Sequence, residues 1–327
     1  MTEEAPLVSG MLQAVQADLH GLLDQLIADP KLFEMVEHHF GWAEGAAVGK
    51  GIRPLLCLLC CAGAGGQWER ALPAATAIEL IHNFSLIHDD IQDRSELRRH
   101  RPTVWKVWGE ALAINAGDAL FACSRLSTQR LDLHPAALLA VQRMLDEASL
   151  ELTIGQQLDL GFDTRSDGSL QNYLRMIEAK TAALLAACTG TGALVAGVGE
   201  ERLQAFQAFG RLLGMAFQIQ DDILGIWGLP DRTGKAVGLD LLQRKPSYPA
   251  LHAIQASRQF AALWSNSESD VDALLAGLEA AGSREAAARA VSEHTSRSLA
   301  SLARADPAQP AARALRNLAD GLLERQS

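Results

Sequence analysis

The sequence contains few aromatic side chains and few cysteines. Aromatic residues make up 5% of the 327 residues, and the five cysteines lie in apolar runs without paired ligand spacing. Cys57 and Cys60 form a CxxC, but the surrounding run LLCLLCC favours a core helix over a metal or redox site. The sequence therefore does not predict a disulfide-linked secreted fold, and we expect a reducing, cytoplasmic location.

Basic charge is also scarce, and no segment is apolar enough for a membrane. The chain carries 29 Lys and Arg against 39 Asp and Glu, a net charge of −10, which argues against nucleic acid as a partner. No apolar run of about 18 residues is free of charge, so we expect no membrane insertion. The first ten residues, MTEEAPLVSG, are acidic and lack the apolar region of a signal peptide. Against this background, a local cluster of Lys and Arg is informative.

No alternating strand pattern is present, and helical periodicity dominates. Hydrophobic residues make up 48% of the chain, and no linker, repeat or composition shift marks a domain boundary. We predict a single all-α domain over residues 1–327, with Ser169 capping the helix that follows it. The expected helices cover about 6–28, 31–40, 51–64, 71–93, 111–131, 135–160, 170–198 and 200–227, with an Ala-rich helical remainder at 247–327.

Two aspartate-rich segments, DDIQD and DDILG, lie inside long apolar stretches. In the first, Asp89 and Asp93 are four residues apart and share a helix face, with Asp90 beside them. In the second, Asp221 and Asp222 are adjacent. Carboxylates crowded on an apolar helix repel one another and lose hydration, so we expect a cation among them. Mg²⁺ takes oxygen ligands and shares itself with substrate phosphates, so these segments predict diphosphate chemistry.

Basic residues lie near the first acidic segment. Arg98 and Arg99 follow it in RSELRRHRPTVW and have two interpretations: solvated surface ion pairs, or a clamp for phosphate oxygens. Lys50 and Arg53 in GKGIRP are either an ordinary loop-to-helix junction or a phosphate site at a helix N-terminus. His82 lies two turns before the acidic segment, and it is interpreted either as a core histidine or as an anion ligand. The predicted metal cluster nearby favours the clamp.

The second acidic segment also has polar neighbours. Lys180 and Thr181 interrupt the apolar helix RMIEAKTAALLAAC, where a lysine must either reach solvent or find an anion. Gln218 precedes Asp222 by one helical turn. The loop after the segment carries Lys235, and Lys245 follows. This loop is either an unremarkable exposed segment or a basic lid that closes over bound phosphate.

These motifs resemble those of the trans-isoprenyl diphosphate synthases, also called polyprenyl synthetases. The resemblance covers residues 45–250 and implies an all-α bundle around a deep central cavity, usually a homodimer. It also implies condensation of isopentenyl diphosphate with an allylic diphosphate. The matching segments, in the order of the family, are GKGIR, His82, DDIQD with the following RR, NAGD at Asn115–Asp118, GQQLD at Gly155–Asp159, Lys180-Thr181, FQIQDD and the GK segment that extends to Lys245.

The resemblance implies a role for each candidate residue. Three Mg²⁺ ions on the allylic diphosphate would be held by Asp89, Asp93 and Asp221, with support from Asp90 and Asp222. The same diphosphate would be neutralised by Arg98, Lys180 and Lys245, with Lys235 closing over it. Isopentenyl diphosphate would bind to Lys50, Arg53, His82 and Arg99. Thr181 and Gln218 would direct oxygen dipoles toward the developing cation. The carboxylates of both acidic segments are therefore expected to meet at one bound diphosphate.

The sequence departs from the family pattern at two positions. Gly225 stands where the third aspartate of the second motif is usual, and His100 replaces the glycine that commonly follows RR. Product length in the family depends on the positions four and five residues before the first aspartate, here Ser85 and Phe84. One aromatic residue with a small neighbour suggests geranylgeranyl diphosphate, with twenty carbons, as the product; farnesyl diphosphate, with fifteen, is the second choice.

Two other functions remain possible from the sequence. A class I terpene cyclase would share the fold, but its second metal motif is usually of the NSE type and it needs no isopentenyl site. A non-catalytic regulatory subunit would typically lose the acidic or basic residues, whereas here nearly all are retained. Both alternatives are less favoured than a prenyltransferase.

Overall fold

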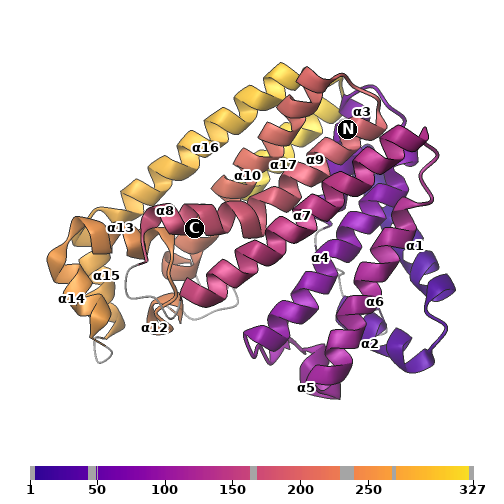
Figure 1. Ribbon diagram of the computed structural model, residues 1–327. Helices are drawn as coiled ribbons and strands as arrows, with labels where there is room; N and C mark the ends of the chain where they lie inside the picture. The colour runs from indigo at the N-terminus through magenta and orange to yellow at the C-terminus, as the bar shows by residue number, and fades with distance from the viewer. Residues whose placement is uncertain are drawn as a thin grey trace. The chain divides into compact units, whose positions relative to one another are not determined.

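The computed structural model describes residues 4–42, 49, 51–162, 168–228, 239–266 and 270–323. These residues are predominantly helical, so the all-α prediction is confirmed (Figure 1). Among them, the only strands are Leu97–Arg98 (β1) and Arg101–Pro102 (β2), which pair as one antiparallel hairpin. Strands of two residues are too short to produce an alternating pattern in a sequence. No helix in the described ranges is long and apolar enough to cross a membrane.

Most of the predicted helices begin and end near their expected limits, whereas α5 and α12 lie in segments for which no helix was predicted. The first ten are α1 (Glu4–Leu26), α2 (Pro30–Phe40), α3 (Ile52–Gly63), α4 (Leu72–Gln92), α5 (Val104–Trp108), α6 (Glu110–Thr128), α7 (Pro135–Phe162), α8 (Leu170–Ile177), α9 (Ala183–Val195) and α10 (Glu200–Trp227). The later ones are α12 (Leu239–Leu242), α13 (Tyr248–Ala256), α14 (Arg258–Ser265), α15 (Val271–Ala280), α16 (Ser283–Ala305) and α17 (Ala311–Leu323).

The predicted helix at 170–198 is divided in the structure. Ser169 accepts a hydrogen bond from the Asn172 backbone N–H at 3.1 Å, so the predicted cap of α8 is confirmed. Between α8 and α9 the chain forms one π-helical turn, Glu178–Ala182. A π turn contains one residue more than an α turn, and such turns often occur at functional sites. Lys180 and Thr181 lie within it.

The described helices divide into two compact units, with boundaries inside α7, α9, α10 and α17 and at the end of α16. Unit 1 comprises residues 1–146, 188–203 and 306–314, and unit 2 comprises residues 147–187, 204–305 and 315–327. The division into two compact units does not test the prediction of a single domain, which stays a prediction.

The core of unit 1 lies among α1, α2, α4 and α6. Helix α4 packs along α6, and both also contact α1. The apolar residues of this core include Leu19, Leu23, Phe40, Leu80 and Leu120. All five cysteines are buried and free, which confirms the core-helix interpretation of the CxxC on α3.

One apolar core of unit 2 lies where α10 meets the helices that follow it. Its buried residues include Ile226 at the end of α10, Phe260 on α14, and Leu274 and Leu278 on α15. Helix α13 contacts α8, α14, α15 and α16. The C-terminal end of α10, which carries the second acidic segment, is therefore packed into this unit.

Candidate active site

The first acidic segment occupies the C-terminal end of α4. Asp89 is half-buried, and Asp93 is exposed as the residue that ends the helix. The Asp93 backbone N–H donates to the Asp89 carbonyl at 2.8 Å, which completes the last turn. The two side chains are four residues apart and therefore share a face of α4. Both supply hard oxygen ligands of the kind that Mg²⁺ takes.

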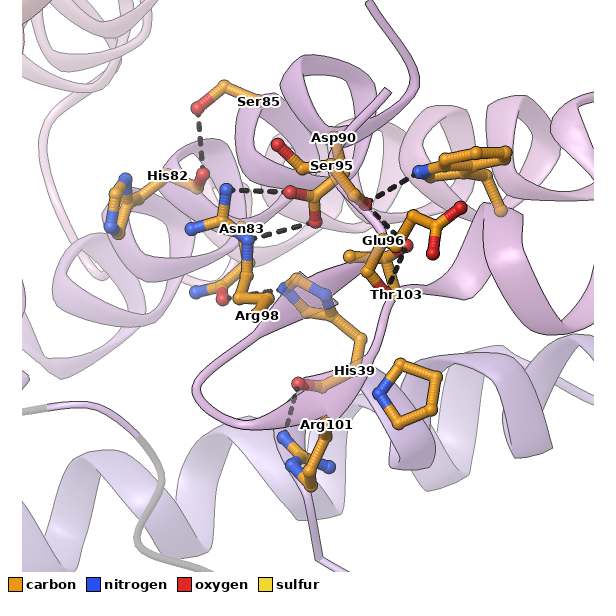
Figure 2. Close-up of polar contacts among 12 residues, drawn as sticks. His39, His82, Asn83, Ser85, Asp90, Ser95, Glu96, Arg98, Arg101 and Thr103 are labelled. Atoms are coloured by element: carbon orange, nitrogen blue, oxygen red, sulfur yellow. Dashed lines mark hydrogen bonds and ion pairs between the residues drawn. The ribbon is translucent and has the colours of Figure 1, made fainter. Parts of the chain in front are cut away.

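Asp90 has a different environment from its two neighbours. It is 3% exposed, and Arg98 binds both of its oxygens, with Nε to Oδ2 and Nη2 to Oδ1 each at 2.8 Å (Figure 2). Burial raises the pKa of Asp90, and the Arg98 guanidinium opposes this rise. A bidentate pair of this kind defines the position of both side chains. Asp90 therefore connects α4 to the hairpin that carries Arg98.

The hairpin turn explains the departure at His100. Arg98 pairs with Arg101 across the hairpin, so the two residues between them form the turn. Arg99 has φ 52° and His100 has φ 64°, and both lie in the left-handed region. Two-residue hairpins favour positive φ at both turn positions, which glycine adopts without steric cost. The structure therefore retains the backbone geometry of a glycine turn while a histidine occupies it.

Several hydrogen bonds attach this hairpin to the rest of unit 1. Thr103 Oγ1 and Trp105 Nε1 both donate to the Ser95 carbonyl at 2.8 Å. At the end of α2, Arg101 donates to the His39 carbonyl at 3.1 Å (Figure 2). It also donates to the His38 carbonyl at 2.5 Å. The two arginines predicted to bind phosphate therefore belong to a segment that is fastened at both ends.

The predicted isopentenyl site contains a contact between Arg53 and His82. Arg53 Nη1 and His82 Nε2 are 3.2 Å apart. A guanidinium has no acceptor, so Nε2 accepts this bond and the neutral ring carries its proton on Nδ1. Burial, and then the charge of Arg53, lower the pKa of His82 well below its usual value. His82 thus orients Arg53. Lys50, also predicted for this site, lies outside the described residues.

A buried polar chain beside these residues was not identified from the sequence. Asn83 donates to Glu79 Oε1 at 3.0 Å and interacts through its own oxygen with His39 Nε2 at 3.0 Å. Glu79 is 4% exposed; burial raises its pKa, while Asn83, Arg53 and Arg99 lower it. The one sequence signal was the polar pair Glu79 and Asn83, one turn apart on an otherwise apolar helix.

The two residues predicted to limit product length lie on α4, about one turn N-terminal to Asp89. Ser85 is buried, and its hydroxyl donates to the His82 carbonyl at 2.8 Å. The Phe84 ring contacts the Phe121 ring of α6 edge-on, with centroids 5.0 Å apart. Phe121 was not identified from the sequence, because nothing in the chain links two aromatic residues that are 37 positions apart. Phe84 is therefore one of a pair of rings between α4 and α6.

In unit 2, Lys180 has an anionic partner on α7. Its Nζ lies 2.5 Å from Asp159 Oδ2, and both side chains are about one quarter exposed. Asp159 belongs to the GQQLD segment and follows Gly155 by one turn. Thr181, the next residue of the same π turn, donates from its Oγ1 to Gln218 Oε1 on α10 at 2.9 Å. The π turn is thus linked to α7 on one side and α10 on the other.

The second acidic segment combines one exposed and one buried carboxylate. Asp221 is exposed, whereas Asp222 is 4% exposed. Asp222 Oδ2 accepts hydrogen bonds from the Tyr173 hydroxyl and, at 2.8 Å, from the Tyr248 backbone N–H. Burial raises the pKa of Asp222 to about 7, and these two bonds oppose the rise. Gly225 is within the same helix, one turn after Asp221.

Comparison with known proteins decides the family. The family model described as polyprenyl synthetase matches residues 33–277, which include both acidic segments. The chain belongs to the polyprenyl synthetase family. It is a trans-prenyltransferase of isoprenoid synthesis, and the prediction of this enzyme class is confirmed.

The relatives of this polyprenyl synthetase differ in their products. The chain is 39% identical to the (2E,6E)-farnesyl diphosphate synthase of Mycobacterium tuberculosis, with 100% of this chain and 95% of the relative covered. It is 38% identical to the geranylgeranyl diphosphate synthase of the same organism, with 91% of this chain and 89% of the relative covered. The solved polyprenyl synthetase of Streptomyces coelicolor A3(2) is 35% identical, with a TM-score of 0.89 and coverage of 98% and 100%. The fold is therefore that of the family, and the product length is not decided by these names.

The remaining site predictions for this family member stay predictions. Among the described residues, no three His, Cys, Asp or Glu side chains form a metal cluster by themselves. Asp89 and Asp93 belong to unit 1 and Asp221 to unit 2, so their predicted meeting at one diphosphate is untested. Lys245 is exposed between α12 and α13, while Lys235 lies outside the described ranges.

Proposed function

We propose that this chain condenses isopentenyl diphosphate with an allylic diphosphate and that its main product is geranylgeranyl diphosphate. The observation that carries the proposal is the end of α4, where the carboxylates Asp89 and Asp93 share one face beside the Arg98–Asp90 pair. Paired carboxylates next to ordered guanidiniums suit a metal-bound diphosphate, since each charge then has a partner of opposite sign.

The allylic diphosphate is proposed to bind with Mg²⁺, which members of the family generally use. The proposed ligands are Asp89 and Asp93 in unit 1 and Asp221 in unit 2, all of them carboxylates, with three ions per site. When bound, Mg²⁺ offsets the negative charge that grows on the departing diphosphate. Lys180 is proposed to contribute a further positive charge. The proposed residues that assist are Arg98, Lys235 and Lys245 as cations, and Asp90 and Asp222 as supports.

Isopentenyl diphosphate is proposed to bind Arg53 and Arg99, together with Lys50. In this proposal His82 acts by accepting the hydrogen bond from Arg53, so that the guanidinium presents its remaining donors in one orientation. The rigid hairpin does the same for Arg99. The carbon–oxygen bond of the allylic diphosphate breaks first, and the double bond of isopentenyl diphosphate attacks the resulting allylic cation. A proton is then lost from the new chain to the departed diphosphate. Thr181 and Gln218 direct oxygen dipoles toward the positive charge.

The proposed product length rests on the aromatic rings of Phe84 and Phe121, of which Phe84 lies about one turn before Asp89 on α4. Ser85 leaves space on the face of α4 that carries Asp89, because the two are one turn apart and serine is small. Phe84 and Phe121 form an edge-on pair between α4 and α6. We propose that this pair stops growth after the twenty-carbon product. Relatives that make farnesyl diphosphate make the fifteen-carbon product the second candidate.

We also propose that the enzyme is a homodimer. Four apolar residues of α6 and the start of α7 within unit 1 are exposed: Leu112, Ile114, Leu126 and Leu139, the last at 64%. Large contiguous apolar patches on a surface mark protein interfaces, and we propose that these four residues belong to one. Analytical ultracentrifugation should show a dimer, and Leu126→Glu should shift it toward monomer. Leu242→Glu, at a leucine 60% exposed on α12, is the matched control and should leave the dimer intact.

The function is tested by incubating the purified protein with Mg²⁺, isopentenyl diphosphate and dimethylallyl, geranyl or farnesyl diphosphate, followed by sizing of the products. A twenty-carbon diphosphate is expected from each primer. A fifteen-carbon product would overturn the proposed length but retain the reaction. A hydrocarbon would identify a cyclase, and no turnover would favour the regulatory subunit.

A matched pair of variants tests the metal site. Asp89→Asn should lower turnover by at least about a hundredfold, because a ligand to the charge-neutralising ion is lost. Asp24→Asn removes an equally charged group from the exposed face of α1 and should have no effect. Equal activity of the two variants would exclude Asp89 from the site.

A further inference from the structure

The chain contains two tyrosines, and both contact one carboxylate in unit 2. The Tyr173 hydroxyl, on α8, donates to Asp222 Oδ2, and the Tyr248 backbone N–H, at the start of α13, donates to the same atom. Tyr173 is 1% exposed and Asp222 is 4% exposed. Three helices thus meet at one oxygen atom of a buried carboxylate.

The junction of Tyr173, Asp222 and Tyr248 lies close along the chain to two residues of the proposed diphosphate site. Asp222 directly follows Asp221, the proposed metal ligand, in the last turns of α10. Tyr173 precedes Lys180 by seven residues, two helical turns, along the segment formed by α8 and the π turn. A rotation of α10 or of this segment about its axis would therefore move Asp221 or Lys180 together with the junction.

A second hydrogen bond joins the same two segments. Thr181 Oγ1 donates to Gln218 Oε1 at 2.9 Å, one turn before Asp222 on α10. Two hydrogen bonds at separate points oppose both sliding and rotation of one segment against the other. The Tyr173 bond is the more deeply buried of the two, and a buried carboxylate is strongly destabilised when a donor is removed.

We propose that Tyr173 is a positioning residue, which holds the Asp222 carboxylate and through it sets the direction of Asp221 and its distance from Lys180. The inference rests on the proposed function, because Asp221 and Lys180 are proposed there to bind the metal-bound allylic diphosphate. Outer partners that orient metal ligands commonly change metal affinity or activity by tenfold to a hundredfold when they are removed.

The test uses Tyr173→Phe, which removes the hydroxyl and retains the ring. Two quantities are measured in the full-length protein: the Mg²⁺ concentration for half-maximal turnover, and the Mg²⁺ concentration that half-saturates the thermal shift with inorganic pyrophosphate. Both should rise about tenfold. The KM for isopentenyl diphosphate should change less than about twofold, since Tyr173 acts on the other substrate.

Ser298→Ala is the matched control. Ser298 is 1% exposed, and its hydroxyl donates to the Phe209 carbonyl of α10 at 2.9 Å, several turns before the acidic segment. This variant also removes a buried hydroxyl that holds α10. It should lower the melting temperature without altering the Mg²⁺ dependence. An equal Mg²⁺ shift in Ser298→Ala would show general loosening of α10 and would overturn the proposal.

A double variant separates positioning from packing. In the Asp222→Asn background, Tyr173→Phe should add less than about a twofold change to the Mg²⁺ dependence, since the group it holds has already been altered. Full additivity would mean that Tyr173 does not act through Asp222. The pyrophosphate thermal shift needs no turnover, so it also distinguishes failure of this inference from failure of the proposed reaction: an inactive wild-type protein that still binds Mg²⁺ and pyrophosphate contradicts only the reaction.

Discussion

Gly155 on α7 lies against the backbone of Lys180: a Cβ at Gly155 would stand 2.2 Å from the Lys180 nitrogen and 2.5 Å from its Cα. One turn later on the same helix, Asp159 binds the Lys180 side chain. The two positions form a notch that receives the π turn. The GQQLD segment is therefore explained by close packing at its glycine and by charge at its aspartate.

This relationship predicts the effect of Gly155→Ala. The added methyl group must displace the π turn, so Lys180 and Thr181 should move away from their partners. We expect a loss of about 1 to 3 kcal/mol in the free energy of unfolding and a clear rise in the KM for the allylic diphosphate. Gly161→Ala lies on the same helix, at a position where an added Cβ would meet no atom within 4 Å. It is the control and should leave both quantities nearly unchanged. Normal kinetics in Gly155→Ala would show that the notch is not needed.

The hairpin turn predicts a stabilising substitution. His100 has φ 64°, a conformation that costs a residue with a side chain about 1 kcal/mol or more. His100→Gly should therefore raise the free energy of unfolding by about 1 kcal/mol, measured by denaturant titration. His100→Ala retains a Cβ and hence the strain, so it should give no gain. If both variants have the same stability, the side chain of His100 rather than its backbone decides this position.

Burial of His39 predicts a pH dependence of stability. Burial lowers the pKa of His39 from 6.5 to about 3, so the unfolded state takes up a proton first as the pH falls below 6.5. The free energy of unfolding should then fall by about 1 kcal/mol per pH unit between pH 6.5 and 3 from this residue.

The variant His39→Gln isolates this contribution, because glutamine retains an N–H for Asn83 and does not titrate. Its unfolding free energy should depend less steeply on pH in that window than that of the wild type. His134→Gln, at an exposed histidine, is the control for removal of a histidine outside the core. The measurement is urea unfolding at pH 7 and pH 5, and identical slopes in all three proteins would contradict the assignment.

The ring pair between α4 and α6 predicts a change of product. Phe84→Ala should lengthen the main product by one five-carbon unit, with Phe121 still in place as the next barrier. The double variant Phe84→Ala/Phe121→Ala should give still longer chains, detected by sizing of the products. Phe33→Ala removes a partly buried ring from the same core and serves as the control for destabilisation. Unchanged length in Phe84→Ala would show that this ring does not limit the chain.

The helical order was predictable because apolar periodicity is a property of a single segment, and some helices also carry a local cap. Ser169 illustrates this, since its capping bond joins residues three positions apart. The π turn at Lys180 was not predictable: it depends on the close approach of Gly155, which lies 25 positions earlier. The hairpin after α4 was also missed, because two strands of two residues leave no pattern.

The candidate site divides in the same way. Asp89 and Asp93 were identifiable because both belong to one turn of one helix. The pairing of Asp90 with Arg98 and the contact of Phe84 with Phe121 were not, since each depends on which segments pack together. Nor did the sequence distinguish the exposed Asp221 from the buried Asp222, although the two are adjacent.

The sequence alone determined the helical class of this protein and the positions of its acidic and basic motifs. It also determined that these motifs suit the binding of metal ions and diphosphate. Those properties follow from side-chain type and from spacing along a single helix. The tertiary structure decided which of these charges are paired inside the protein, as Asp90 and Asp222 are, and which backbone approaches demand glycine. Such properties depend on contacts between segments far apart in the chain, and helical periodicity carries no information about those contacts.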